Sequence, residues 1–181
     1  MERHGDMTPA TERFILQWGE MGSRWGVNRS VAQIHAYMFL AIDPVTAEQI
    51  AGDLNLARSN VSNSIKELLS YQLIRPEPVK GDRRDFYAAE TDPWEVMMRL
   101  SEARKQREID PAMAMLQSAV AEIEAEGKAD KQVLQRLRGL DTLLGQMASW
   151  YDQVKRLPKP VLKALVKLGG KVSGFVKKDA G

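Results

Sequence analysis

Short hydrogen-bonding side chains crowd one face of a helix expected near the middle of the chain. These residues are Arg58, Ser59, Asn60, Ser62 and Asn63. Serine and asparagine are mediocre helix formers, so helix propensity does not explain their accumulation here. Amide, hydroxyl and guanidinium groups match the donors and acceptors on the base edges and phosphates of DNA. We therefore take these five residues as candidate DNA contacts, with a solvated helix face as the alternative.

A second set of candidate DNA contacts lies in a segment with the composition of a short β-hairpin. Gly81 and Asp82 are turn formers. The strand formers are Val79 on one side and Phe86 and Tyr87 on the other, so Val79 is expected in the first strand of the hairpin. The charged residues at the tip are Lys80, Asp82, Arg83 and Arg84. Cations at the tip of such a wing can contact the phosphate backbone or the minor groove. Ordinary turn charges are the alternative.

Two short helices over residues 46–71 must position the polar face. Thr46 caps the first helix and Gln49 completes a capping box. The second helix is expected from about Ala57 to Tyr71, although alanine is a poor cap. The apolar and small residues that would pack the two helices together are Ile50, Ala51, Leu54, Leu56, Val61 and Ile65. With the basic hairpin they predict a winged helix-turn-helix, whose second helix enters the major groove. For the helices alone, a structural helical hairpin is the alternative.

Two further helices are expected before this module. Bulky residues recur at helical spacing in the first of them, namely Phe14, Trp18, Met21 and Trp25. Gly22 and Gly26 are expected to fray or end that helix. A second helix is expected over about residues 28–41. His35 within it is expected to be a core-edge residue, because His4 is the only other histidine and their separation suggests no metal or catalytic pair.

Beyond the hairpin the sequence predicts a helical region. Asp92 and Pro93 start a helix, which Asp110-Pro111 is expected to break or kink. A further helical stretch is expected to end at Gly127, because glycine is the residue type preferred just after a helix C-terminus. The next helix, over about residues 130–157, has apolar residues spaced 4, 3, 4, 3, 4, 3: Val133, Leu137, Leu140, Leu144, Met147, Tyr151 and Val154.

That unbroken heptad pattern indicates a packed helical seam. A helix packed against its own chain would explain it. A dimer seam is favoured, because a helical arm outside a small domain lacks enough neighbours to bury the seam alone. The expected fold class is mainly α with a small β-wing: a winged helix-turn-helix plus a long C-terminal helical dimerisation arm. We expect a DNA-binding domain over residues 8–92, a helical dimerisation region over 93–157 and a basic tail over 158–181.

The tail reads VLKALVKLGGKV, in which Lys163, Lys167 and Lys171 recur every four residues. Residues 155–181 hold eight basic residues and one acidic residue. This pattern predicts a short basic amphipathic helix. DNA phosphates, an acidic partner and a membrane surface are all possible partners for it, and a frayed terminus is the alternative.

Composition limits the classes of function. The 181 residues carry a net charge of only +2, so the placement of charge matters more than its total. The absence of cysteine excludes disulfides, thiolate zinc sites and cysteine nucleophiles, and it fits a cytoplasmic protein. We expect no signal peptide and no transmembrane segment, since no apolar run approaches ~20 residues. No nucleophile–base pair, metal cluster or phosphate loop is visible, so we expect neither an enzyme nor a cofactor.

Three segments in order resemble the MarR-type winged-helix regulators, and specifically their GbsR branch. They are the opening RFILQWGEMGSRWGVNRSVAQIHAYMFL, the helix-turn-helix, and GDRRDFYAAETDPWEVM. The resemblance covers about residues 10–155. The family's wing carries an Asp-Xaa-Arg pattern, matched here by Asp82 and Arg84, in which the Asp orients the Arg toward DNA. The branch's association with genes for osmoprotectants such as choline is not carried over to this chain.

The resemblance implies a homodimeric transcriptional regulator, often a repressor, that binds double-stranded DNA and responds to a small molecule. A palindromic operator would suit a two-fold dimer. The aromatic residues Trp18, Trp25, Tyr37 and Trp94 are candidates for an effector pocket, because an aromatic cage suits a quaternary ammonium. Ordinary core packing is the alternative for them. The alternative for the whole chain is a winged-helix protein-interaction module without sequence-specific DNA recognition.

Overall fold

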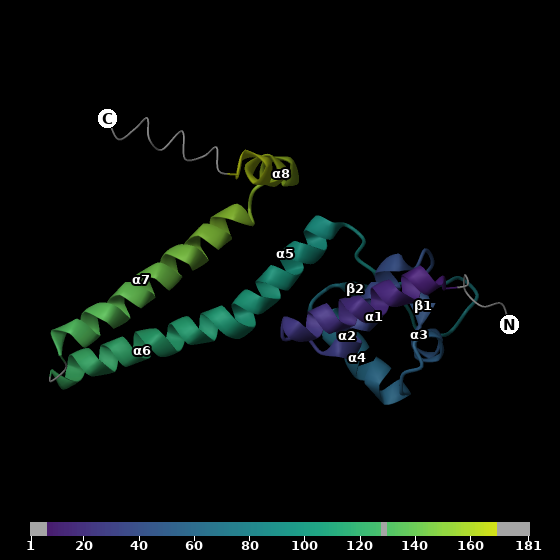
Figure 1. Cartoon of the computed structure of the whole chain (residues 1–181), viewed down its shortest axis with the longest axis horizontal. Helices are drawn as coiled ribbons and strands as arrows, with labels where there is room; N and C mark the ends of the chain where they lie inside the picture. The colour runs from purple at the N-terminus through teal and green to yellow at the C-terminus, as the bar shows by residue number, and fades with distance from the viewer. Residues whose placement is uncertain (1–6, 128–129, 170–181) are drawn as a thin grey trace. The chain divides into compact units, whose positions relative to one another are not determined.

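The computed structural model describes residues 7–127 and 130–169 and is drawn in Figure 1. It divides into two compact units, the first ending at Leu100 and the second starting at Ser101. The first holds α1 (Pro9–Arg24), α2 (Arg29–Leu40), β1 (Val45–Thr46), α3 (Ala47–Asp53), α4 (Arg58–Ser70), β2 (Ile74–Pro76), β3 (Phe86–Ala89) and most of α5 (Pro93–Arg104). The second holds the π-helical segment η1 (Lys105–Ile109), α6 (Asp110–Glu126), α7 (Lys131–Val154) and α8 (Lys159–Leu168). The predicted fold class, mainly helical with a small sheet, is confirmed.

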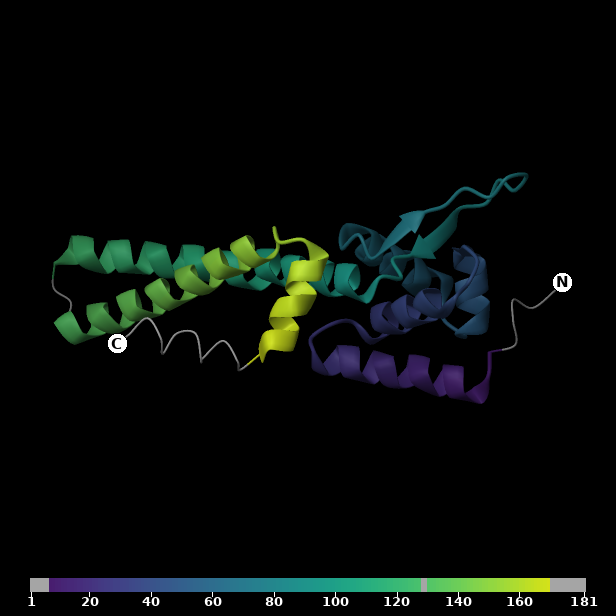
Figure 2. The ribbon, with the colours of Figure 1, turned by 90° about the horizontal axis from the view of Figure 1, so that it is seen from above.

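Helices α1 and α2 lie side by side, as Figure 2 shows. They approach closely because glycines of α1 face α2: a Cβ on Gly22 would lie 2.5 Å from the Cβ of Ala32. Gly22 is therefore a buried contact inside α1, and the expectation that it frays the helix is wrong. The helix ends with Trp25 as its C-cap, followed by Gly26 at a φ of +77°. The bulky stripe predicted for α1 lies beside the buried face, which leaves Phe14 exposed.

The helix-turn-helix begins and ends as the sequence predicts. The N–H of Thr46 donates to Oε1 of Gln49 at 2.7 Å, and the N–H of Gln49 donates to Oγ1 of Thr46 at 3.2 Å. Ala57 is the N-cap of α4 and provides no side-chain cap. Buried side chains from α2, α3, α4 and the sheet form the core: Val31, Ile34, Met38, Val45, Ile50, Val61, Ile65 and Leu68. One side of α4 is fixed in this core, and the other side is left exposed.

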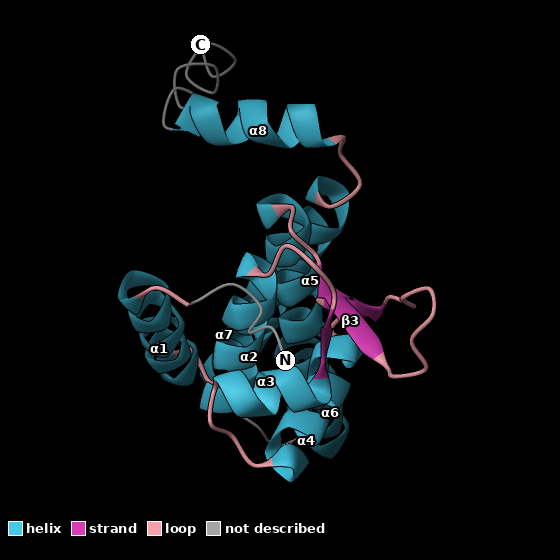
Figure 3. Ribbon diagram, turned by 90° about the vertical axis from the view of Figure 1, so that its right-hand side faces the viewer, coloured by secondary structure: helices cyan, strands magenta, loops and turns pink. Residues whose placement is uncertain are grey.

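A three-stranded antiparallel sheet in the order β1-β3-β2 forms the wing, which Figure 3 shows in magenta. Ile74 pairs with Ala89 and Pro76 pairs with Tyr87. The expectation that Val79 lies in the first hairpin strand is wrong, because the strand ends at Pro76 and Val79 lies in the loop. Pro76 is tolerated since β2 is an edge strand, where a missing N–H breaks no central ladder. The short strand β1 was not expected from the sequence.

In the second unit, α6 and α7 form an antiparallel hairpin (Figure 1). Gly127 ends α6 in the left-handed conformation at a φ of +64°, as predicted, and Asp130 caps α7. Of the two outcomes expected at Asp110-Pro111, a break or a kink, the break is wrong, because α5 continues through η1 into α6. Proline removes one helical N–H and crowds the preceding turn, and the wider π-helical turn directly before it relieves that crowding. Within residues 7–127 and 130–169, no helix has the length and hydropathy needed to cross a bilayer.

Candidate nucleic-acid interface

The exposed side of α4 carries four of the five predicted contacts and one further cation. Exposed side chains line this side in succession: Arg58, Ser59, Ser62, Asn63 and Lys66. Lys66 was not among the predicted contacts. Its position four residues after Ser62, and three after Asn63, is the spacing that puts it on the same face. The face therefore presents two cations and three short polar groups on a helix whose opposite side is held in the core.

Asn60 lies outside this face. Its Nδ2 donates to Oγ of Ser30 in α2 at 2.8 Å, and its Oδ1 accepts from Oγ of Ser64 at 3.5 Å. The predicted exposed position of Asn60 is wrong because Asn60 and Ser64, one turn apart, lie next to the buried Val61 on the side that faces α2. Asn60 links α4 to α2 and so helps to hold the exposed face in place.

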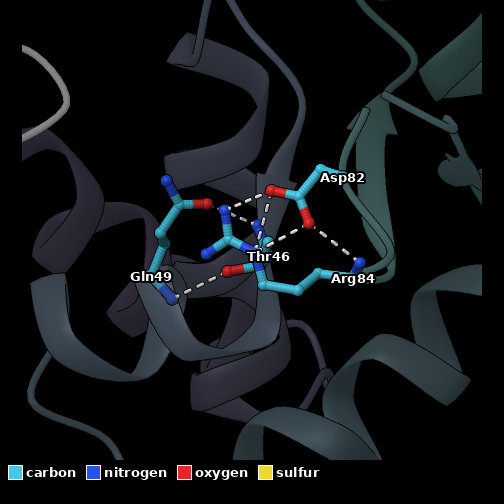
Figure 4. A network of polar contacts seen from close by, with 4 residues as sticks. All are labelled: Thr46, Gln49, Asp82 and Arg84. Atoms are coloured by element: carbon cyan, nitrogen blue, oxygen red, sulfur yellow. Dashed lines mark hydrogen bonds and ion pairs between the residues drawn. The ribbon is translucent and has the colours of Figure 1, made fainter. Parts of the chain in front are cut away.

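Asp82 and Arg84 interact with each other in the wing loop, as Figure 4 shows. The Nε of Arg84 donates to the two carboxylate oxygens at 3.1 and 3.0 Å, and its Nη2 donates to Oδ2 at 2.5 Å. Hydrogen bonds from Arg84 lower the pKa of Asp82 to about 2, and the same contacts raise the pKa of Arg84. The Arg84 guanidinium carbon also lies 5.3 Å from the centroid of the Phe86 ring. The pair has the geometry in which a carboxylate orients an arginine.

The loop with this pair also carries the remaining wing cations. Figure 2 shows the segment between β2 and β3 projecting from the helices of the first unit. Lys80 and Arg83 are exposed in it, and Gly81 at a φ of +87° permits the turn. Three cations therefore gather in one projecting loop, with Asp82 neutralising part of their charge.

Arg99 of α5 holds the base of the wing. It donates to the carbonyl oxygen of Gln72 and forms an ion pair with Glu90 at 2.9 Å. Gln72 lies in the turn after α4, and the N–H of Glu90 donates to the carbonyl oxygen of Leu73 at 2.9 Å. Arg99 thus connects the end of α4 to both ends of the hairpin. Sequence reasoning missed this residue, because no local pattern indicates a contact across 27 positions.

Two of the four predicted effector-pocket residues share a cavity in the first unit. Trp18 and Trp25 lie on the wall of a cavity of about 50 Å³ that is also lined by α2, the end of α4 and α5. Tyr37 and Trp94 are not on that wall, so the predicted cage of four is not assembled. The hydroxyl of Tyr37 donates instead to Oδ2 of Asp53 at 2.6 Å. Burial and this bond raise the pKa of Tyr37.

The predicted seam of α7 divides between two faces. Its half-buried members are Leu137, Leu144, Tyr151 and Val154, and its exposed members are Val133, Leu140 and Met147. Since α6 packs along α7, packing within the chain accounts for part of the heptad pattern. Two residues outside the pattern extend the exposed part into an apolar stripe with spacing 3, 4, 3: Leu140, Leu143, Met147 and Trp150.

Helix α8 is basic and amphipathic, as the tail sequence predicts. Lys163 and Lys167 are exposed, and Leu162 is buried. Other apolar residues of this helix are exposed, namely Val161, Leu165, Val166 and Leu168. Lys171, the rest of residues 170–181, and His4 lie outside the described residues.

Among known proteins, the chain resembles solved structures but matches no sequence family. No family model and no curated protein matches the chain. A crystal structure of a transcriptional regulator matches with a TM-score of 0.59 and 22% identity, over 80% of this chain and 95% of that one. The chain shares the fold of that regulator.

Two other solved structures align with lower scores. NMB1585, a MarR family regulator from Neisseria meningitidis, matches with a TM-score of 0.37 and 15% identity, over 84% of this chain and 99% of that one. The MepR–DNA complex from Staphylococcus aureus also has a TM-score of 0.37 and 15% identity, over 76% of this chain and 92% of that one.

Proposed function

We propose that the chain is a sequence-specific DNA-binding transcriptional regulator of the MarR type. The observation that carries the proposal is the exposed polar and cationic face of α4, in a fold that sets a basic wing beside the helix-turn-helix. In this proposal α4 enters the major groove, and Lys80, Arg83 and Arg84 contact the backbone or the minor groove. The fold shared with a transcriptional regulator supports the proposal. The sequence resemblance of the opening segment and the wing supports the GbsR branch.

The chemistry of the α4 face favours DNA over a protein partner. Protein interfaces rely on aromatic and aliphatic anchors at their centre. The exposed side of α4 offers Ser59, Ser62 and Asn63 between two cations, and no apolar residue. Such a face suits hydrogen bonds to base edges and charge-assisted bonds to phosphates.

The proposal includes a homodimer. The exposed stripe Leu140, Leu143, Met147 and Trp150 runs along α7, and burying it against a second copy removes apolar surface from water. Two α4 helices related by a two-fold axis would meet successive major grooves, roughly 34 Å apart, on a palindromic site. Residues 8–92 then form the DNA-binding domain, residues 93–157 the dimerisation region and residues 158–181 a basic tail.

In this proposal the protein is cytoplasmic and represses transcription, and a small molecule relieves the repression. A ligand shifts the equilibrium between two states only if it binds them with different affinity. The cavity beside the C-terminal end of α4 supports this part of the proposal, because its occupant would touch the helix that recognises DNA.

The test of DNA recognition starts with genomic fragments retained by the purified protein at moderate salt. We expect a recurrent palindrome that the Arg83→Ala/Arg84→Ala protein does not retain. Affinity for that site is then measured by fluorescence anisotropy over a salt series, with Lys66→Ala and the matched control Lys131→Ala, an exposed lysine of α7. Lys66→Ala should lower the slope of log K against log salt by about 1 per lost phosphate contact. The control should leave it unchanged.

Two results would count against the regulator. One is the absence of an enriched site for a folded protein, and the other is equal affinity for the selected and a random duplex. Either result would favour the protein-interaction module.

The test of the dimer uses α7. We expect the Leu140→Glu/Met147→Glu protein to sediment as a monomer, because two charges would enter an apolar interface. Gln146→Glu, an exposed position on the same helix, is the matched control and should keep the dimer. A dimer that survives the double substitution would show that this stripe is not the interface.

A further inference from the structure

Helix α8 has the composition of a helix that lies at a boundary between water and lipid. Its ten residues, Lys159–Leu168, comprise three lysines, five large aliphatic residues, one proline and one alanine. Prolines on both sides of Lys159 favour the start of the helix, and Gly169 ends it at a φ of +44°. Alanine, leucine and lysine between these limits are good helix formers. Local chemistry therefore defines a helix that is about 15 Å long.

The lysines and the aliphatic residues of α8 occupy different sides of the helix. Lys159, Lys163 and Lys167 recur every four residues, which is the spacing that places side chains on one side. The large aliphatic residues fall on the remaining side, namely Val161, Leu162, Leu165, Val166 and Leu168. One side of α8 is therefore cationic, and the other is apolar.

The rest of the described chain covers little of the apolar side. Leu162 is the one buried residue within Lys159–Leu168. Val166 is 68% exposed, and Val161, Leu165 and Leu168 are exposed as well. Aliphatic side chains gathered on one exposed surface mark a site of interaction with a protein or a membrane.

We propose that α8 binds the surface of an anionic lipid bilayer. The helix lies in the plane of the surface, Leu165 and Val166 enter the boundary between headgroups and acyl chains, and Lys163 and Lys167 contact lipid phosphates. Residues 155–181 hold eight basic residues and one acidic residue, so their charge is opposite to that of the bilayer. Since α8 has half of the ~20 residues that a spanning helix needs, it lies on the membrane. This inference does not depend on the proposed function.

Other partners match the two sides of α8 less well. DNA phosphates would attract the lysines, but the backbone of the duplex offers no apolar surface to cover Val166. A groove on a protein relies on aromatic and arginine anchors, and α8 has neither. Two α8 helices packed against each other would bring their lysines together. A bilayer requires apolar area and positive charge without a fixed shape, and α8 provides both.

The test measures sedimentation of the full-length protein with lipid vesicles in the absence of DNA. One set of vesicles is pure phosphatidylcholine, and the other is phosphatidylcholine mixed with the anionic phosphatidylglycerol. We expect binding to the anionic vesicles to be about a hundredfold tighter, because each lysine near an anionic surface contributes about fivefold and α8 has three.

The contribution of charge is tested by neutralising two lysines of α8. Lys163→Gln/Lys167→Gln should weaken binding to the anionic vesicles about 25-fold, and glutamine preserves the helix. The matched control is Lys131→Gln/Arg136→Gln, which removes two exposed cations from α7 and should leave vesicle binding unchanged.

The contribution of the apolar side is tested at Val166. Val166→Asn should weaken binding about tenfold, because the aliphatic side chain no longer leaves water. Met115 in α6 is also 68% exposed, so Met115→Asn is the matched control and should have no effect. Arg83→Ala/Arg84→Ala should keep vesicle binding, which separates α8 from the basic wing.

Five results would overturn the inference. Three concern the vesicles: no binding of the folded protein to anionic vesicles, equal binding to both kinds, and unchanged binding of the Lys163→Gln/Lys167→Gln protein. Loss of DNA affinity without loss of vesicle affinity in that same protein would assign the lysines to DNA. A change of oligomeric state in the Val166→Asn protein, measured by sedimentation velocity, would assign the apolar side to a second copy.

Discussion

Acid should destabilise the first unit through His35. The pKa of this side chain is 6.5 in the unfolded chain and about 4 in the folded one, because burial disfavours the charged ring. The unfolded chain therefore binds more protons between these values, and stability falls as the pH falls through that window. At pH 5 the unfolded histidine is mostly protonated and the folded one mostly neutral. The expected loss between pH 7.5 and pH 5 is about 2 kcal/mol, and the full loss below pH 4 is about 3 kcal/mol.

Urea unfolding followed by tryptophan fluorescence measures this loss. Three of the four tryptophans, Trp18, Trp25 and Trp94, lie in the first unit, so a Trp150→Phe background reports on that unit alone. His35→Phe and His35→Gln in the same background do not titrate and serve as controls. The other titrating groups are common to all three proteins, so the difference between their pH dependences isolates His35. Parallel loss of stability in all three proteins would refute the assignment of a buried, neutral His35.

Three further substitutions test the packing of the first unit. Gly22→Ala should lower the free energy of unfolding by about 1–3 kcal/mol, because the new Cβ would lie 2.5 Å from the Cβ of Ala32. Gly52→Ala, a helical glycine with open space around it, should instead raise it by up to about 1 kcal/mol, and urea unfolding compares the two. Tyr37→Phe should cost about 1 kcal/mol by removing the bond to Asp53, and faster hydrogen exchange in α3 should accompany it. Unchanged exchange would show that this bond does not hold α3 to α2.

The helix-turn-helix could be predicted because its signals are local. The capping box of Thr46 and Gln49 fixes the start of α3, and the spacing of Val61 and Ile65 fixes the buried side of α4. Element boundaries follow from such short-range chemistry. The helical repeat that buries Val61 and Ile65 also places Lys66 on the exposed side of α4, so the position of Lys66 could have been predicted from the sequence. Asn60 was placed on the exposed side because its side chain is polar. Its position in the helical repeat instead puts it on the same side as Ser64.

The features that the sequence did not predict depend on distant partners. The role of Gly22 depends on Ala32 in the next helix, and a glycine viewed alone indicates only a weak point in a helix. Arg99 bonds to residues of the turn after α4 and the end of β3, which no periodicity connects. His35 is similar, because an unpaired nitrogen becomes visible only when its surroundings are known. Gly22 and Arg99 set the distance between α1 and α2 and the position of the wing.

The heptad pattern of α7 shows how one periodicity can serve two interfaces. Residues such as Leu144 are half-buried in the hairpin with α6, whereas Leu140 and Met147 of the same pattern are exposed. If packing against α6 accounted for all apolar residues of α7, the exposed face of α7 would need no apolar residues. Leu143 and Trp150 nevertheless lie on that face outside the heptad positions, and both are more than half exposed. Apolar residues repeated over three helical turns are costly to leave in water. The exposed stripe, rather than the heptad pattern itself, is therefore the stronger argument for a second copy.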